Sequence, residues 1–417
     1  MNAEIISIGD ELLIGQVINT NQALLAEKLN SIGIAVHRMT TVGDEEDKIL
    51  EAFARGMNDH DLLLVTGGLG PTHDDITRNA VCRFFGTDLV VNEEALSRVR
   101  GFFERRGIAP RKINEDQALV PRSCMVIQND HGTAPGFLFE RSGRYLIALP
   151  GVPFEMKAMT EAFILPFFAS RSSGSVIRHR TLKTTGIGES FLAEQMGDVT
   201  ALLGTDDGIT LAFLPSPTGT RLRITVQAKT VDEADTKISN VERGIRSKAG
   251  KYIYAVDDEE LEQTLGRLLL ERHLTIAVAE SCTGGLIADR ITDVPGSSVY
   301  FERSYVTYSN ESKLADLGVP TALILKHGAV SREVAEAMAF GVRLKSNTDI
   351  GLSTTGIAGP TGGSAEKPVG LVWIGYSDRS VTLALQFNFG EDRKRTKVRA
   401  AQAALELVRR KLLKIES

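Results

Sequence analysis

The sequence predicts an α/β fold that is divided into three domains. The chain has 417 residues, which is more than one hydrophobic core usually supports. Apolar strand-like runs alternate with helical patterns near both ends, as is typical of βαβ units around a parallel sheet. Between about residues 175 and 251 the order of strands and helices changes. We therefore expect an α/β domain at residues 1–170, a small α+β domain at 171–254 and a second α/β domain at 255–417.

The composition describes an ordinary folded protein of the cytoplasm. Apolar residues make up 42% of the chain and charged residues 24%, with a net charge of −5, so direct binding of nucleic acid is not expected. The three cysteines are widely spaced and form no CxxC pair, which favours a reducing compartment. The chain begins directly with a strand-like run, without a basic leader, and no apolar run approaches the length of a membrane span.

The first domain is expected to place a glycine-rich turn at the edge of its sheet. Gly67, Gly68 and Gly70 follow an apolar strand and allow a tight turn and a close approach of the backbone to a ligand. Asp74 or Asp75 can cap the helix that follows. The predicted elements are strands at 3–9, 36–41, 61–66 and 145–149, and helices at 21–32, 46–57 and from 151 to about 170.

The remaining elements are expected in the same way from their apolar spacing. The middle domain reads as a β-α-β-β-α unit. In the last domain, Val398, Ala401, Leu405, Val408 and Leu412 form one apolar stripe on a long final helix. The other predicted elements there are helices at 261–272 and 331–344, strands at 274–279, 305–309 and 351–356, and a hairpin at 369–377 and 381–389.

The segment ESCTGG stands between an apolar strand and a helix. Unpaired backbone N–H groups at a helix start attract anions, so Ser281, Thr283 and Gly284 are candidates for ligand binding. Alternatively, Ser281 or Thr283 merely caps the helix, and Glu280 is a hydrogen-bond partner. The helix start would also lower the pKa of the Cys282 thiol, although a small buried residue is the favoured interpretation of this cysteine.

A serine and a lysine further along form a second candidate pair. Ser298 lies in PGSS and Lys313 in VTYSNESK. A lysine can activate a serine without histidine or metal if burial lowers the pKa of its amine. Tyr308 could then relay a proton or orient the lysine. The alternative is that Ser297 caps a helix and Lys313 lies on a solvated face.

A second loop of small residues, from residue 353 to 370, follows another strand. Its glycines and prolines suggest a shaped pocket wall, where the Thr355 hydroxyl could bond a ligand. Arg393 stands near the start of the last helix and could contact a phosphate. The alternatives are a flexible surface loop and a charge that faces water.

These C-terminal motifs together resemble the nicotinamide-mononucleotide (NMN) deamidase family, the C-terminal domain of the CinA competence/damage-inducible proteins. The resembling stretches are AESCTGG, PGSSVYFERSYVTYSNESK, HGAVS, TTGIAGPTGGSAEKPVG and GEDR. The resemblance implies hydrolysis of NMN to nicotinate mononucleotide and ammonia without a cofactor. It implies further that Ser298 is the nucleophile, Lys313 its base and Tyr308 an aid to proton transfer, and that Ser281, Thr355 and Arg393 hold the substrate.

The first domain resembles the molybdopterin-binding superfamily in its CinA form. IISIGDELLIGQVINTNQ, VGDE, TGGLGPTHDDIT and ALPGVPFEM carry this likeness. It implies an α/β sandwich that hydrolyses ADP-ribose to AMP and ribose 5-phosphate with a divalent metal, Mg or Co. Asp10, Asp44 and Asp75 are then the candidate metal ligands, and the glycine-rich turn is a cradle for the pyrophosphate.

The middle domain resembles the KH-like domain of the same proteins. Its GIGES stretch is too short a match to predict RNA binding, so a spacer or dimerisation role is expected. The whole chain is then predicted to be a homodimeric, bifunctional enzyme of pyridine-nucleotide salvage. The alternative is a non-enzymatic protein that binds a molybdopterin-like pterin or recombination partners during competence.

Overall fold

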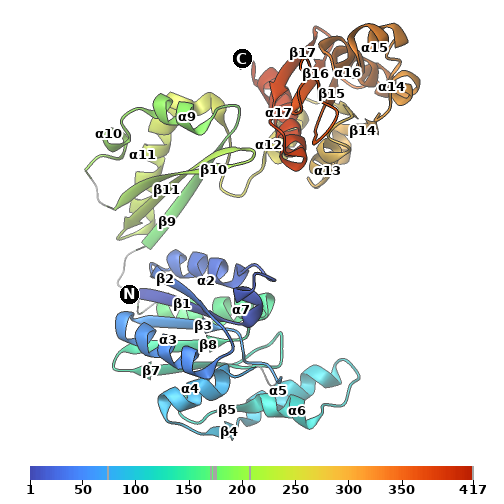
Figure 1. Cartoon of the computed structure of the whole chain (residues 1–417). Helices are drawn as coiled ribbons and strands as arrows, with labels where there is room; N and C mark the ends of the chain where they lie inside the picture. The colour runs from blue at the N-terminus through green and yellow to red at the C-terminus, as the bar shows by residue number, and fades with distance from the viewer. Residues whose placement is uncertain (73–74, 170, 172–175, 206–207, 416–417) are drawn as a thin grey trace. The chain divides into compact units, whose positions relative to one another are not determined.

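The structure, a computed structural model, describes the chain except residues 73–74, 170, 172–175, 206–207 and 416–417. It contains three larger sheets, one in each predicted domain (Figure 1), so the predicted three-domain architecture is confirmed. The interpretation of Asp74 as a helix cap and the expected helix end near residue 170 lie outside the described residues. Among the described residues, no helix is both long and apolar enough to cross a membrane.

The N-terminal sheet is parallel where the sequence predicts it and antiparallel beyond. Its order is β2-β1-β3-β8-β7-β6. Strands β2, β1, β3 and β8 run parallel, whereas β7 and β6 are antiparallel additions that the sequence analysis missed. The strands are β1 (Asn2–Ile8), β2 (Ala35–Val42), β3 (Leu62–Thr66), β6 (Met125–Ile127), β7 (Gly136–Arg141) and β8 (Arg144–Leu149).

Helices cover both faces of this sheet. Ile6 and Ile8 of β1 belong to a buried cluster with α3 (Glu46–Asp59) and α4 (Thr77–Phe85). Ala3 and Ile5 belong to another cluster, with α2 (Thr20–Ser31) and α7 (Pro153–Met159). The pleat of the strand explains this division, because successive side chains point to opposite faces.

The smaller N-terminal elements flank this core. A separate ribbon pairs β4 (Leu89–Val91) with β5 (Leu119–Pro121) in antiparallel fashion. The others are α1 (Asp10–Leu13), α5 (Glu93–Glu104), α6 (Lys112–Glu115), the 3₁₀ turn η1 (Asp116–Ala118), the π-helical turn η2 (Thr160–Ile164) and α8 (Leu165–Ala169).

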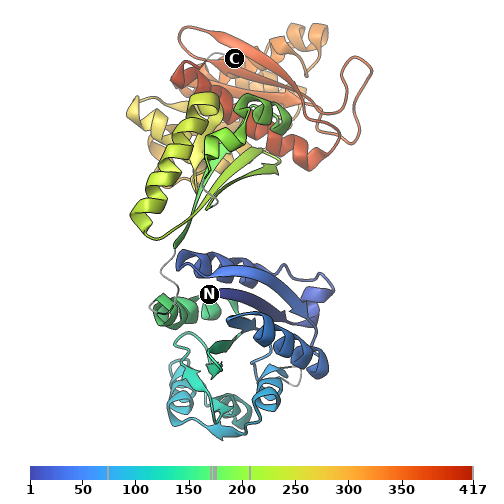
Figure 2. The ribbon, with the colours of Figure 1, turned by 90° about the vertical axis from the view of Figure 1, so that its left-hand side faces the viewer.

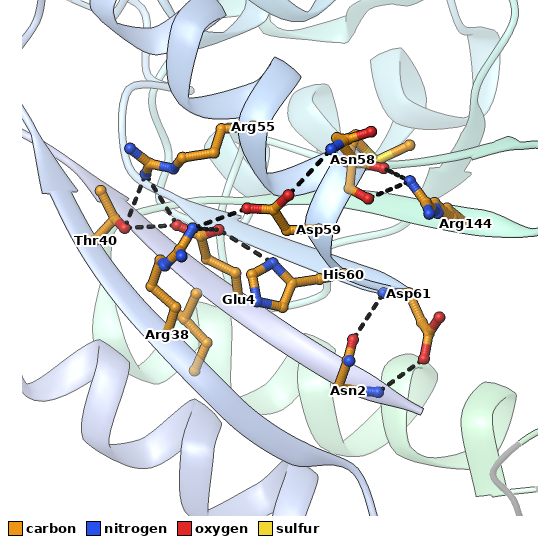
Figure 3. A network of polar contacts seen from close by, with 12 residues as sticks. Asn2, Glu4, Arg38, Thr40, Arg55, Asn58, Asp59, His60, Asp61 and Arg144 are labelled. Atoms are coloured by element: carbon orange, nitrogen blue, oxygen red, sulfur yellow. Dashed lines mark hydrogen bonds and ion pairs between the residues drawn. The ribbon is translucent and has the colours of Figure 1, made fainter.

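A buried carboxylate on β1 forms hydrogen bonds and ion pairs with the neighbouring elements (Figure 3). Glu4 is fully buried. Its Oε1 accepts hydrogen bonds from Thr40 Oγ1 at 2.6 Å and Arg55 at 3.2 Å, and its Oε2 lies 3.3 Å from His60 Nδ1. Because a buried charge is costly unless it is paired, this network holds β1, β2 and α3 in one arrangement.

The middle domain is a four-stranded sheet with one long helix packed along it (Figure 2). The strand order is β10-β11-β9-β12. Strand β11 alternates between buried and more exposed residues, as expected for a sheet that is covered on one face. The elements are β9 (Val176–Thr184), α9 (Glu189–Met196), α10 (Val199–Leu203), β10 (Ile209–Ser216), β11 (Gly219–Ala228), α11 (Val231–Ala249), the 3₁₀ turn η3 (Gly250–Tyr252) and β12 (Ile253–Val256).

The C-terminal domain is a five-stranded sheet between two helical layers. The order is β14-β13-β15-β16-β17, in which β14, β13 and β15 are parallel and the last two strands form the predicted antiparallel hairpin. The strands are β13 (Ile276–Glu280), β14 (Phe301–Val306), β15 (Ile350–Gly356), β16 (Leu371–Ser377) and β17 (Thr382–Asn388).

Alternate residues of β13 separate the two layers of helices. Ile276 and Val278 pack with α12 (Leu261–Glu271), α13 (Leu286–Thr292) and α17 (Arg393–Leu413). Ala277 and Ala279 pack on the other face, against α16 (Arg332–Ser346) and the residues around α14 (Asn310–Leu317) and α15 (Thr321–His327).

The strand predicted at residues 305–309 was placed too late in the sequence. It is β14, and it begins at Phe301. Its last backbone bond to β13 runs from Thr307 N to Glu280 O at 2.8 Å. The strand ends there because Ser309 already caps the next helix, its Oγ accepting from Ser312 N at 3.1 Å. This shift places Ser298 immediately before the strand, in the short 3₁₀ turn η4 (Ser297–Val299).

Candidate functional site

Lys313 is buried beside the ESCTGG turn. Its side chain is 1% exposed, and its Nζ donates to Ser281 Oγ at 3.2 Å, to Thr307 O at 2.8 Å and to Ser309 O at 3.4 Å. Strands β13 and β14 are parallel, so the segments that follow them meet at one edge of the sheet. The alternative of a solvated lysine is therefore wrong.

The surroundings of Lys313 favour its neutral amine. Burial lowers the pKa of Lys313, and the nearby Cys282 and Glu311 oppose this shift. Its three hydrogen-bond partners are one hydroxyl and two carbonyls, none of them a carboxylate. A lysine in such a place can accept a proton from a serine hydroxyl.

Glu280 shapes the turn that carries Ser281. This carboxylate is fully buried and accepts from the backbone N–H groups of Gly285 at 3.0 Å, Ile287 at 3.1 Å and Ala288 at 2.9 Å. These donors at the start of α13 are consequently not available to a substrate anion. The expectation that a substrate anion binds these three N–H groups is therefore wrong. The alternative interpretation, in which Glu280 is a hydrogen-bond partner, is correct.

The predicted threonines lie in the same buried region. Thr283 Oγ1 and Thr354 Oγ1 are 2.7 Å apart, and Thr355 Oγ1 donates to Ala329 O at 2.8 Å. Both predicted residues are at most 1% exposed. Each hydroxyl already has a partner within the fold, and the role of Thr283 and Thr355 in substrate binding stays a prediction.

Tyr308 and Arg393 meet at the surface. The Arg393 guanidinium donates to Tyr308 Oη at 2.9 Å and to Gly359 O at 2.8 Å. It therefore connects the segment after β14 with the loop after β15 and the start of α17. The tyrosine is 61% exposed, so its ring is open to a ligand.

The sequence analysis missed Lys397. A Cβ atom placed on Gly284 would lie 3.5 Å from Lys397 Nζ, so this half-buried cation lies next to Gly284, an exposed residue of the turn. It follows Arg393 by four residues, and positions i and i+4 share one face of a helix. That spacing in the sequence was the signal that could have identified Lys397.

The structure does not bring Ser298 to Lys313 within this chain. Ser298 precedes β14, and the first residue of that strand, Phe301, pairs with the first residue of β13, Ile276. Lys313 lies beyond the other end of both strands. The five steps from Phe301 to Val306 alone span about 16 Å. The expected contact is therefore wrong within one chain, and Ser281 stands beside the lysine instead.

Cys282 is a buried structural residue, as favoured from the sequence. It is 6% exposed, and burial raises the pKa of its thiol to about 12. The expected lowering by the helix start is wrong, because desolvation of the thiolate is the larger effect.

The glycine-rich turn of the first domain is tightly packed. Gly67 has φ +111° and Gly68 has φ +63°. A Cβ on Gly67 would collide with the carbonyl of Ile8 and one on Gly68 with the side chain of Thr77. The turn also contains Gly70, whose N–H donates to Asp75 Oδ1 at 2.7 Å. The glycines are therefore required for the close packing of this backbone.

The three predicted metal ligands have different surroundings. Asp75 accepts from the N–H groups of Gly70 and Thr72, so its carboxylate holds the turn. Asp10 and Asp44 bind each other's backbone: Asp10 N donates to Asp44 Oδ2 at 3.0 Å, and Asp44 N to Asp10 Oδ1 at 3.2 Å. Across the described part of the chain, no three His, Cys, Asp or Glu side chains are grouped as a metal site.

Comparisons with known proteins agree with these domains. Residues 4–170 match the family described as "Probable molybdopterin binding domain", residues 179–255 the "Damage-inducible protein CinA KH domain" and residues 258–412 the "CinA C-terminal domain". A solved structure of a competence/damage inducible protein from Agrobacterium tumefaciens is 38% identical, with a TM-score of 0.35, and the match covers 37% of this chain and 97% of that one.

Relatives of the same length complete the comparison. A CinA-like protein of Chloroherpeton thalassium is 47% identical over 98% of this chain and 99% of its own length. One of Salinibacter ruber is 45% identical over 99% of this chain and all of its own. This identity over nearly the whole of both chains shows that the protein belongs to the CinA family.

Proposed function

We propose that the C-terminal domain is an amidohydrolase that converts NMN to nicotinate mononucleotide and ammonia. The observation that carries this proposal is Lys313, a buried lysine whose pKa is lowered and whose Nζ lies 3.2 Å from a serine hydroxyl. A serine with a neutral lysine as its base can attack an amide carbonyl without a metal. The choice of NMN as the substrate rests on the resemblance of the surrounding motifs to NMN deamidases.

In the proposed reaction, neutral Lys313 takes the proton from a serine hydroxyl while the serine oxygen bonds to the carboxamide carbon. The ammonium of Lys313 returns the proton to the departing nitrogen, which leaves as ammonia. Water then hydrolyses the acyl-serine ester to the carboxylate of nicotinate mononucleotide. The resemblance assigns the nucleophile to Ser298, whereas the geometry within one chain offers Ser281.

Turnover of NMN by the purified chain tests this function. We expect release of ammonia and a product whose mass is that of nicotinate mononucleotide. Ser298→Ala and Ser281→Ala are then compared, together with Lys394→Met as an exposed control on α17. If only Ser298→Ala abolishes formation of the acyl-serine ester, Ser298 is the nucleophile. A chain that binds NMN but never turns it over contradicts the proposal and favours a binding protein.

For the N-terminal domain we propose hydrolysis of ADP-ribose. Asp10 and Asp44 follow adjacent parallel strands and bind each other's backbone, and the glycine turn follows β3 at the same edge of the sheet. Two carboxylates suit a Mg²⁺ ion, which takes its other ligands from water and substrate phosphates. The metal would neutralise charge on the pyrophosphate, while the carboxylates fix its position.

The N-terminal proposal is tested with Asp10→Asn and Asp44→Asn. We expect both variants to lose metal-dependent release of AMP from ADP-ribose and to keep NMN turnover. Asp75→Asn serves as the comparison, because that carboxylate already holds the turn. A pterin that copurifies with the chain, without AMP release by wild type, would favour the alternative of a pterin-binding protein.

A further inference from the structure

A groove lies along the last strand and the last helix of the C-terminal domain. Its volume is about 1260 Å³, and none of the residues placed in the two proposed catalytic sites lines it. One wall consists of the half-buried side chains Leu385, Phe387 and Phe389, on and just after β17. Helix α17 forms another wall, and residues 185–189 and 215–220 of the middle domain complete the groove.

The walls of the groove belong to one compact unit of the fold. This unit consists of His179–Ile224 and Ile238–Ser417, and it includes all the residues that line the groove. Tyr254 of β12 belongs to the hydrophobic core of the C-terminal domain, and Arg409 on α17 donates to Lys251 O at 2.8 Å. These contacts hold the middle-domain loops against α17.

The helix wall combines an apolar middle with cationic ends. Ala403 and Leu407 line the middle, Arg399 lines one end, and Lys411 and Lys414 line the other. Successive members of this set are three or four residues apart, so they lie along one side of the helix. A ligand with an apolar body and an anionic group at the lysine end would match this order.

The two lysines have no carboxylate of their own. Lys411 and Lys414 are exposed, and their side chains form no ion pair or hydrogen bond within the described part of the chain. The buried carboxylate of Glu406 also lines the groove. It accepts hydrogen bonds from Arg409 and Arg410, at 2.7 to 2.9 Å, and is therefore already neutralised.

Two further carboxylates line the groove. Asp378 accepts from Tyr376 Oη at 2.9 Å and from the N–H groups of Ser380 and Val381, so it holds the turn between β16 and β17. Glu189 is exposed in the first turn of α9. Two free lysines therefore oppose one exposed carboxylate, in a chain whose net charge is −5. The groove thus has a local excess of positive charge.

We propose that this groove binds an organic anion with a flat or aliphatic apolar body. The parallel rings of Phe387 and Phe389, with centroids 5.4 Å apart, offer apolar surface to that body. Lys411 and Lys414 hold the anionic group by charge-assisted hydrogen bonds. Apolar walls with a few charged groups are typical of small-molecule sites. The proposal does not depend on turnover of NMN or ADP-ribose.

Binding of anilinonaphthalene sulfonate (ANS), a fluorescent aromatic anion, tests this site on the full chain. We expect saturable binding with energy transfer from Trp373, the single tryptophan, which pairs with Gln386 of β17. Lys411→Met/Lys414→Met should raise the dissociation constant of ANS about tenfold, the effect of one charged hydrogen bond. Phenylnaphthylamine, which has the same rings without the sulfonate, should bind this variant and wild type equally.

A matched control removes two cations from the exposed start of the same helix. Lys394→Met/Arg395→Met should bind ANS as wild type does, whereas Ile187→Ser in the middle-domain wall should weaken both probes. Decanoate and naphthalene sulfonate are then compared as competitors of ANS: displacement by either supports the site and shows whether it prefers an aliphatic or a flat body. Absence of ANS binding, an equal loss in the two double variants, or displacement of ANS by NMN would overturn the proposal.

Discussion

At the scale of single residues, burial decides which groups can act. Lys313 and Cys282 are buried beside the same turn, and burial disfavours the charged form of each. For the lysine the neutral form is the reactive base, whereas for the cysteine the neutral thiol is the unreactive form. In the proposed reaction, desolvation therefore favours the reactive form of Lys313 and the unreactive form of Cys282.

The lowered pKa of Lys313 predicts the pH dependence of NMN turnover. Because the base must be neutral, kcat/KM should rise with pH through the lowered pKa of the lysine and level off above it, below the range of an exposed lysine. Lys313→Met should lose about 10²–10⁴-fold in kcat, the usual contribution of a general base. The measurement is a pH profile of ammonia release. A flat profile across that range would show that another group takes the proton.

Lys397 predicts a preference for nucleotides over nucleosides. Its ammonium lies next to the exposed Gly284, on the same helix face as Arg393, where a phosphate could meet both cations. Lys397→Met should raise KM for NMN about 10- to 150-fold, with little change in kcat, since loss of one charged hydrogen bond costs about 1.5–3 kcal/mol. Turnover of nicotinamide riboside, which has no phosphate, should stay unchanged. An equal loss with both substrates would assign Lys397 a structural role; Lys394→Met is the matched control.

At the scale of elements, the sequence predicted the alternating strands and helices well, because their apolar spacing is local. It placed β14 too late, because VTYS looks like a strand when read alone. Its true bounds depend on pairing with β13, from Phe301 opposite Ile276 to Val306 opposite Glu280, and on the Ser309 cap. Such long-range contacts are not visible in the sequence. For the same reason the relative positions of Ser281, Ser298 and Lys313 could not be predicted.

The turn between β13 and α13 predicts a role for Glu280 in positioning Ser281. Its carboxylate holds three backbone N–H groups. In Glu280→Gln one acceptor oxygen becomes an N–H donor that faces these donors. We expect a loss of about 1–3 kcal/mol in the free energy of unfolding, measured by denaturant titration, and a larger fall in kcat than in NMN affinity. Glu271→Gln, at the exposed end of α12, should change neither. An unchanged kcat would show that Ser281 keeps its place without Glu280.

At the scale of the whole molecule, the two proposed sites use different chemistry in separate domains. In these proposals the N-terminal site would use carboxylates that follow parallel strands together with a metal ion, whereas the C-terminal site would use a neutral amine. Each is organised at the carboxyl edge of its own sheet, where α/β folds gather their ligand-binding segments. The fold alone therefore predicts where both sites lie, but only particular side chains distinguish their reactions.

This difference predicts that chelation separates the two activities in one preparation. EDTA should abolish AMP release from ADP-ribose, because the phosphate charge is then no longer neutralised by metal. Added Mg²⁺ or Co²⁺ should restore AMP release. NMN turnover should stay within about twofold of its untreated rate, since general-base catalysis by Lys313 needs no metal. Lys313→Met should show the opposite pattern, with AMP release retained and ammonia release lost. Both products can be followed by mass in the same reaction. Loss of ammonia release on chelation would mean that the amidase also requires a metal, and that Lys313 does not act as the base on its own.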